Sequence, residues 1–369
     1  MIAKTVTNDW LLKWNIQPLA IIFPIILDMI FLVSRTGHFY RYSLTVSSFC
    51  SDNIQLGIWE YQSCIDFRYR HIGVENMSSD AEEIQIPVSW GHISGKWWGP
   101  QDRQPILAIH GWQDNAGSFD KLAPMLLPDF SILCIDLPGH GFSSSYPKGK
   151  VLCIHWDGLI IARQIVKHFE WKKVTIMGHS LGASIGFLYA ATFPDEIDKL
   201  ICLDAASPAV FTNAEIVELT TRNVEKFLRY EESTKEDMPC YPYADMRDIM
   251  MHGHRGSLTP ESCKIMLKRG IHRDPESNNY LFARDVRLLS PLGFISLDMA
   301  LEYASRITCK VLNIKATGTL RHHSYYSRIL NKIKETASTL QVHEVKGTHH
   351  VHLNNPQDIV SFVINFLKS

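Results

Sequence analysis

From residue 83 onward, short apolar runs alternate with longer amphipathic segments along the chain. The short runs are rich in Ile, Leu and Val, which is typical of strands that are covered on both faces of a parallel sheet. The alternation of strand and helix predicts an α/β fold with a mostly parallel central sheet and helices on both faces. The predicted strands are 84–90, 105–110, 131–135, 174–177, 200–203, 310–314 and 339–345, and the predicted helices are 118–127, 157–169, 181–193 and 356–367.

The alternation is interrupted once. Residues 214–304 show helical periodicity without strand-like runs, and Pro and Gly residues mark the loops between the helical stretches. We therefore predict one α/β domain over residues 83–369 that carries a helical cap insertion at about 205–306.

Residues 1–82 form a separate N-terminal extension in this interpretation. The extension contains an apolar run at 18–33, but 16 residues are fewer than the roughly 20 that cross a bilayer, and Pro24 and Asp28 interrupt the run. A transmembrane helix is therefore not predicted. Two interpretations stay open, namely weak association with a membrane through residues 18–33 and a poorly packed or disordered extension.

The net charge of −1 gives the protein no long-range field that would attract a phosphate backbone, so we expect no nucleic-acid partner. The eight cysteines are scattered and include no C-x-x-C pair, which favours reduced thiols and an intracellular location. Composition does not predict the oligomeric state.

The sharpest motif is Gly178-His179-Ser180-Leu181-Gly182, which lies between a predicted strand and a predicted helix. A serine on such a turn adopts a strained backbone that exposes its hydroxyl, and only small residues such as Gly178 and Gly182 leave room for the turn. The motif predicts Ser180 as a nucleophile.

A second motif, His110-Gly111-Trp112, follows the predicted strand 105–110. The backbone N–H groups of Trp112 and Leu181 are candidates for an oxyanion hole, and Gly111 would let the chain turn. We favour a structural role for His110 over a catalytic one. The ring of Trp112 is either part of an acyl pocket or an ordinary core side chain.

A nucleophilic serine needs a base, and the sequence Gly347-Thr348-His349-His350-Val351-His352 follows the last predicted strand, where a catalytic histidine is expected. We predict His349 as the base, with His350 as the alternative and His352 in a packing role. No Cys or H-E-x-x-H pattern accompanies these histidines, so no metal site is expected.

The acid is harder to assign. The segment after strand 310–314, where the acid often lies, contains no carboxylate between residues 315 and 319. Asp204 ends the strand 200–203 at the edge of the sheet that is expected to face the site, so we predict Asp204 as the acid. The alternative is that Asp204 only caps the following turn.

Four longer strings, at residues 90–99, 110–119, 136–143 and 347–354, resemble the serine hydrolase-like proteins of the α/β-hydrolase superfamily. The resemblance covers residues 84–369 and implies a helical cap, no cofactor, a poorly defined substrate and a cytoplasmic, vesicle-associated or peroxisome-associated location. The last three residues, 367–369, do not match a Ser-Lys-Leu-type peroxisomal signal.

The chain also resembles haloalkane dehalogenases, some of which place their acid after the equivalent of strand 200–203, which supports Asp204. Their nucleophile is an aspartate, whereas Ser180 makes acyl transfer to water the expected chemistry. We therefore expect a serine hydrolase that cleaves a small-molecule carboxylic ester or a related acyl bond through an acyl-enzyme. Two alternatives stay open, a catalytically silent binding protein with this fold and an acyltransferase.

Overall fold

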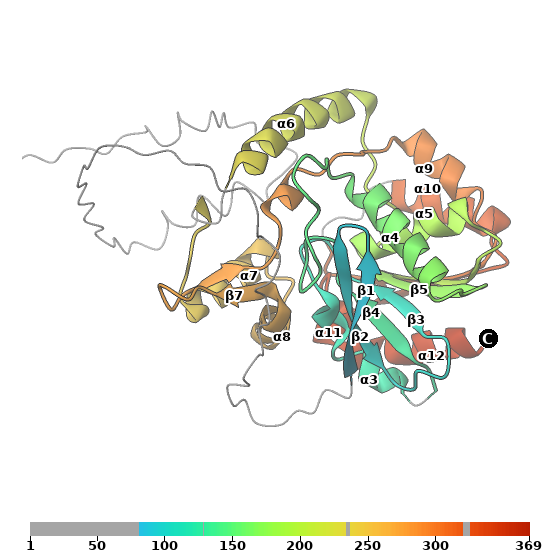
Figure 1. Ribbon diagram of the computed structural model, residues 1–369. Coiled ribbons are helices and arrows are strands. Elements are labelled where there is room, and N and C mark those ends of the chain that lie inside the picture. Colours follow the sequence, from blue (N-terminus) through green and yellow to red (C-terminus); the bar gives the residue numbers. More distant parts are fainter. Residues whose placement is uncertain (1–80, 128, 234–236, 320–324) are drawn as a thin grey trace, which may run out of the picture. The chain divides into compact units, whose positions relative to one another are not determined.

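The computed structural model describes residues 81–369 except 128, 234–236 and 320–324 (Figure 1). The apolar run 18–33, with both of its open interpretations, and nearly all of the extension 1–82 lie outside the described residues. Within the described part, no helix combines the length and the apolar character needed to span a bilayer. The six cysteines of this part are all free thiols.

An eight-stranded sheet forms the centre of the described chain, and its strands from β4 to β10 run parallel to their neighbours. β1 and β2 add an antiparallel edge. This arrangement confirms the predicted mostly parallel sheet. The spatial order is β1 (Ala81–Val88), β2 (Gly91–Trp98), β4 (Ile132–Ile135), β3 (Ile106–Ile109), β5 (Val174–His179), β6 (Ile197–Leu203), β9 (Lys310–Ala316) and β10 (Thr339–Val345).

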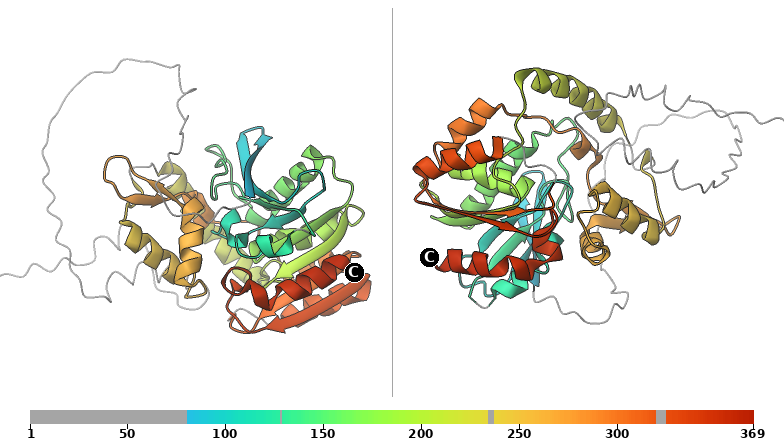
Figure 2. Two further views of the ribbon diagram at one scale, coloured as in Figure 1. Left: turned by 90° about the horizontal axis from the view of Figure 1, so that it is seen from below. Right: turned by 180° about the vertical axis from the view of Figure 1, so that it is seen from behind.

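Helices cover both faces of the sheet, as the buried character of the strands requires (Figures 1 and 2). On one face, Leu107 and Ile109 pack in a cluster with the helices α4 (Ile154–His168), α5 (Leu181–Thr192) and α10 (Tyr325–Thr336). On the other face, Ile106 and Ala108 pack with α3 (Ala123–Leu126) and α12 (Val360–Lys368). The alternation along β3 shows how one strand supplies two cores.

The structure corrects two predicted elements. The strand predicted at 84–90 ends at Val88, because residues 89–90 form a tight turn. β2 begins directly after the turn at Gly91, whose φ is +152°, and pairs antiparallel with β1. The helix predicted at 118–127 is two short pieces, the 3-10 helix η1 (Ala116–Phe119) and α3, because the side chain of Asn115 caps the first piece and Pro124 begins the second. The closing helix is likewise preceded by a short 3-10 helix, η4 (Pro356–Asp358).

The segment between β6 and β9 is mainly helical, and one strand pair interrupts it, which the periodicity did not indicate. Its last helix packs on the core, since Ala300 and Ala304 belong to the same apolar cluster as α5. The elements are α6 (Asn213–Glu232), α7 (Tyr243–Gly253), α8 (Pro260–Gly270), the antiparallel pair β7 (Ile271–Arg273) and β8 (Tyr280–Phe282), the 3-10 helix η3 (Val286–Leu289) and α9 (Leu297–Ala304).

A buried arginine fastens the cap segment to the sheet. Arg269, at the end of α8, donates from Nη2 to Asp136 Oδ2 at 2.6 Å, and its guanidinium lies 4.2 Å from the centre of the Phe142 ring. Asp136 is fully buried and also accepts the backbone N–H groups of Ala116 and Phe142. Because a buried carboxylate needs a partner, this contact ties α8 to the end of β4.

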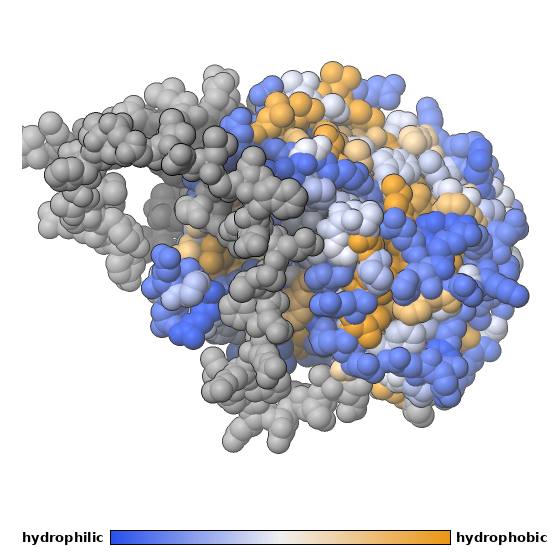
Figure 3. All heavy atoms as spheres, viewed as in Figure 1, coloured by the Kyte–Doolittle hydropathy of each residue, from blue (hydrophilic) through white to orange (hydrophobic). Residues whose placement is uncertain are grey.

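The outer face of the cap helix α6 keeps apolar side chains in contact with solvent. Val217, Val224 and Leu228 are 67%, 38% and 53% exposed, and they recur at helical spacing. Figure 3 shows hydrophobic atoms at the top of the view, where Figure 1 places α6.

Candidate active site

Ser180 occupies the turn between β5 and α5. Its backbone has φ +51° and ψ −105°, a strained conformation for a residue with a side chain. The glycines on either side allow close backbone contact, because a Cβ on Gly178 would overlap the backbone of Gly182 and a Cβ on Gly182 would overlap the carbonyl of Ile109. Both positions therefore require glycine because a side chain would clash there, and not because the backbone has a positive φ.

Three side chains that are far apart in the sequence form a hydrogen-bonded chain at this turn. Ser180 Oγ lies 2.9 Å from His349 Nε2, and His349 Nδ1 lies 2.6 Å from Asp204 Oδ2. The side chain of His349 is 27% exposed, whereas that of Asp204 is fully buried. The arrangement presents a half-buried hydroxyl to an imidazole whose other nitrogen faces a carboxylate, which is the geometry that nucleophilic serine catalysis requires.

The two neighbouring histidines are engaged elsewhere. His350 Nε2 lies 3.2 Å from Asp114 Oδ1, and His350 Nδ1 lies 2.7 Å from Ser257 Oγ. His352 is fully buried, and neither of its ring nitrogens has a hydrogen-bond partner in the described part of the chain. Its ring centre lies 4.1 Å from that of His179, and burial holds its pKa well below the usual range. The structure thus brings His349, and not His350, to Ser180.

Asp204 is held by a backbone donor at the end of β9 and a side-chain donor in the following loop. The backbone N–H of Ala316 donates to Asp204 Oδ1 at 2.6 Å, and the hydroxyl of Thr319 donates to Oδ2. The backbone of Asp204 has a φ of +54°. The loop that lacks a carboxylate in the sequence therefore supplies hydrogen-bond donors to a carboxylate from the adjacent strand. These donors fix the oxygen that faces His349.

The candidate oxyanion-hole residues follow neighbouring strands. Leu181 is the first residue of α5, so its N–H has no acceptor within the helix, and Trp112 follows β3, whose Ile109 pairs with Gly178 of β5. The indole of Trp112 donates to the carbonyl of Leu288 at 3.1 Å, which directs the ring toward the cap segment. The role of both amides in stabilising an oxyanion stays a prediction.

Gly111 differs from the prediction in its physical reason. The positive φ of this loop belongs to Gln113, at +63°, and not to Gly111. A Cβ on Gly111 would instead lie 2.6 Å from Asp114 Oδ2 and 2.8 Å from His179 Nδ1. Gly111 is therefore required for side-chain packing beneath the loop.

Comparisons with known proteins show the family of the chain. The sequence pattern of the alpha/beta hydrolase fold matches residues 104–240. A probable serine hydrolase of Drosophila melanogaster is 45% identical over 290 residues, which cover 78% of this chain and 88% of that protein. The chain belongs to the serine hydrolase-like proteins of the α/β-hydrolase family.

Two further similarities support the assignment. A serine hydrolase-like protein of Danio rerio is 31% identical to this chain over 312 residues, which cover 81% of this chain and 92% of the Danio rerio protein. The crystal structure of a hypothetical protein from Pseudomonas aeruginosa matches 78% of this chain and 98% of its own with a TM-score of 0.69 and 24% identity. That structure shows a shared fold.

Behind the hydrogen-bonded chain, this α/β-hydrolase contains a buried histidine–aspartate network that the sequence analysis missed. His179 Nδ1 lies 3.1 Å from Asp114 Oδ2, and His179 Nε2 donates to the carbonyl oxygen of His349 at 2.9 Å. Both ring nitrogens of His179 thus face oxygen atoms, and the network holds the backbone of His349. The pKa of Asp114 lies well below its usual range, because contacts with His350 and His179 outweigh the opposing effect of burial.

His110 has the structural role that the sequence analysis favoured. Its Nε2 accepts the N–H of Leu137 at 3.0 Å, and its Nδ1 lies 2.7 Å from the carbonyl of Gly111. Burial lowers the pKa of His110, so the ring is neutral and its Nε2 accepts a hydrogen bond from the backbone. The ring links the loop after β3 to the loop after β4.

One group of side chains in the described part could hold a metal ion. It consists of Asp114, His254 and His350, whose ligand atoms all lie within 4.8 Å of one another. This set shares only His350 with the histidine run in which the sequence analysis expected no metal site.

Proposed function

We propose that this α/β-hydrolase cleaves a carboxylic ester, or a related acyl bond, through an acyl-enzyme on Ser180. The observation that carries the proposal is the pair of contacts from Ser180 Oγ to His349 Nε2 at 2.9 Å and from His349 Nδ1 to Asp204 Oδ2 at 2.6 Å. A serine hydroxyl becomes a competent nucleophile when an oriented imidazole takes its proton.

In the proposed first step, His349 Nε2 accepts the proton of Ser180 as Oγ attacks the substrate carbonyl. The N–H groups of Trp112 and Leu181 stabilise the negative charge on the carbonyl oxygen. Asp204 keeps the proton on His349 Nδ1 and stabilises the imidazolium without taking that proton. His349 then protonates the leaving alcohol, and the C–O bond of the ester breaks.

In the second step, His349 removes a proton from water, and the hydroxide attacks the acyl carbon. The bond to Ser180 Oγ breaks, the acid leaves, and His349 returns the proton to Ser180. An acyltransferase would use an alcohol or amine in place of water with the same residues. Product analysis with and without an added alcohol distinguishes the two reactions.

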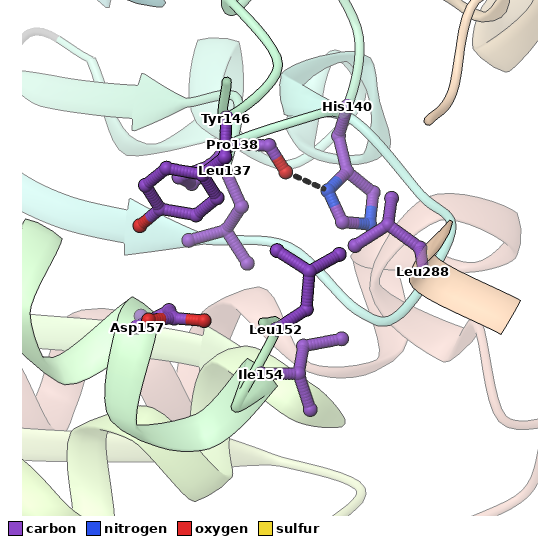
Figure 4. A pocket seen from close by; sticks show the side chains of 9 residues that line it. Leu137, Pro138, His140, Tyr146, Leu152, Ile154, Asp157 and Leu288 are labelled. Atoms are coloured by element: carbon purple, nitrogen blue, oxygen red, sulfur yellow. Dashed lines mark hydrogen bonds between the residues drawn. The ribbon is translucent and has the colours of Figure 1, made fainter. Parts of the chain in front are cut away.

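A small pocket lies between the loop after β4, the start of α4 and the 3-10 helix η3 (Figure 4). Its volume of about 20 Å³ is enough for roughly one water molecule. One of its walls is Leu288, whose carbonyl accepts the Trp112 indole. The lining does not include Ser180, His349 or Asp204, so the pocket does not indicate the size of the acyl group. The lining residues are Leu137, Pro138, His140, Tyr146, Leu152, Ile154, Asp157, Gly158 and Leu288.

A fluorophosphonate probe tests the nucleophile. We expect the probe to label the wild-type chain and to leave the Ser180→Ala and His349→Ala variants unlabelled. Ser184→Ala is the matched control, because Ser184 lies one turn along α5 and donates its hydroxyl to backbone carbonyls. Absence of labelling in a folded wild-type chain would favour the catalytically silent binding protein.

A series of p-nitrophenyl esters of increasing acyl length, compared by kcat/KM, determines which acyl groups the enzyme accepts. Association with a membrane through residues 18–33 and an intracellular location stay predictions. Carbonate extraction of cell membranes tests the first, and fractionation tests the second.

A further inference from the structure

A second cluster, of one carboxylate and two imidazole side chains, lies beside His349 and takes no part in the proposed reaction. Asp114 Oδ1 lies 3.2 Å from His350 Nε2 and 3.9 Å from His254 Nδ1. The three residues come from distant segments, namely the loop after β3, the end of α7 in the cap and the loop after β10. Folding alone brings them together.

We propose that Asp114, His254 and His350 form a binding site for a divalent transition-metal ion of the zinc class. Two imidazole nitrogens and one carboxylate oxygen are a common protein ligand set for such ions, and solvent supplies the remaining positions. The proposal is independent of the reaction proposed for Ser180.

The three ligand atoms must come closer together to hold an ion. Metal–ligand bonds of about 2.0–2.2 Å in a tetrahedral site place ligand atoms about 3.3–3.6 Å apart. The ligand atoms lie within 4.8 Å of one another, so the most distant pair must close by at most about 1.5 Å. The Asp114–His350 distance of 3.2 Å already fits. His254 must approach Asp114 by about half an ångström, and it is the least enclosed of the three ligands, with 15% of its side chain exposed.

The partners of the ligands match those of a metal site. Asp114 Oδ2 accepts the N–H of Gly111 at 3.2 Å and contacts His179 at 3.1 Å, which leaves Oδ1 to face the two histidines. His350 Nδ1 lies 2.7 Å from Ser257 Oγ. Groups that orient a ligating imidazole or carboxylate from behind are typical of metal sites.

A bound ion would contact His350 through Nε2. The proton on Nε2 would then move to Nδ1 and donate to Ser257 Oγ, which lies 2.7 Å from Nδ1.

The site would connect the cap to the sheet. His254 belongs to the cap segment, whereas Asp114 and His350 belong to loops at the carboxyl edge of the sheet, and the rings of His349 and His350 lie 5.5 Å apart. A bound ion would therefore hold α7 next to the proposed reaction centre and raise the midpoint of thermal unfolding.

Cobalt titration of the full chain tests the site without relying on turnover. Chelator-treated protein is titrated with Co²⁺ and followed by visible d–d absorption, and Zn²⁺ is then added to displace the cobalt. We expect one Co²⁺ per chain at this site and at least a tenfold weaker affinity in His254→Gln. His252→Gln is the matched control, because His252 lies two residues earlier on α7 and bonds to the carbonyl of Asp248.

Four further results decide the proposal. Co²⁺ binding that survives His349→Ala and raises the thermal midpoint of wild type but not of His254→Gln supports the site. Equal binding by wild type and His254→Gln overturns the proposal, as does binding that His349→Ala abolishes, because the ion would then lie on the proposed catalytic base. A thiolate-to-cobalt charge-transfer band that persists in His254→Gln would assign the ion to cysteines and would also overturn the proposal.

Discussion

Replacing Asp204 with asparagine removes the negative charge from the buried end of the hydrogen-bonded chain while keeping the shape of the side chain. Its φ of +54° is better tolerated by asparagine than by most residues, so the backbone cost is small. The amide oxygen of the Asp204→Asn variant can still accept the N–H of Ala316, which in the native chain lies 2.6 Å from Oδ1. The amide NH₂ group must then take the place of Oδ2.

This exchange has a specific consequence for His349. In the native chain, His349 Nδ1 lies 2.6 Å from Asp204 Oδ2. An NH₂ group there is a donor, so the neutral imidazole turns its lone pair to Nδ1 and carries its proton on Nε2, which faces Ser180. The ring can then no longer accept the serine proton. The same exchange in a serine-protease triad lowers kcat about 10⁴-fold, which corresponds to about 5 kcal/mol of transition-state stabilisation.

The assay compares kcat/KM for p-nitrophenyl acetate between wild type and Asp204→Asn, with urea unfolding to confirm that the variant is folded. Thr319→Val is the graded control, because it removes only one donor to Oδ2 and should cost roughly ten- to a hundredfold. If Asp204→Asn keeps more than about a tenth of the wild-type kcat/KM, Asp204 is not the acid and serves only to cap the turn after β6.

Three other substitutions test the fold around the site. Gly182→Ala should prevent folding or lower the free energy of unfolding in urea by more than about 3 kcal/mol, because the new Cβ would overlap backbone atoms. Gly253→Ala is the control and should be nearly neutral, because the space around Gly253 is open. Similar losses in both variants would refute the steric argument. Arg269→Met leaves Asp136 buried without its ion-pair partner and should cost about 3–5 kcal/mol, and a loss under about 1 kcal/mol would contradict this role. Burial lowers the pKa of His140 to about 3, below its unfolded value of about 6.5, so its contribution to stability is complete above pH 6.5 and is lost as the pH falls. When the pH is lowered from 6.5 to 5, the free energy of unfolding of His140→Asn should therefore fall by about 2 kcal/mol less than that of wild type. An equal fall in both proteins would rule this out.

The hydrophobic pattern predicted the parallel strands well. Each is buried on both faces, so its consecutive residues are apolar and form a short run that is visible in the sequence. It was wrong at the first edge. The predicted strand 84–90 extends two residues past the end of β1 at Val88, and only the pairing of β1 with β2 shows that residues 89–90 form a turn. The strand pair β7–β8 escaped prediction because its strands have only three residues each.

The turn around Ser180 is a local feature, and the sequence alone determined it: two glycines, a serine, a preceding strand and a following helix lie within one continuous segment. The partners of the serine were decided only by the tertiary structure. Asp204 and His349 are 145 residues apart, and His349 and Ser180 are 169 residues apart, so no spacing along the chain distinguishes His349 from His350. Sheet order makes that distinction, because parallel strands bring their carboxyl ends to one edge and each loop there can turn one side chain toward the serine and the next toward Asp114.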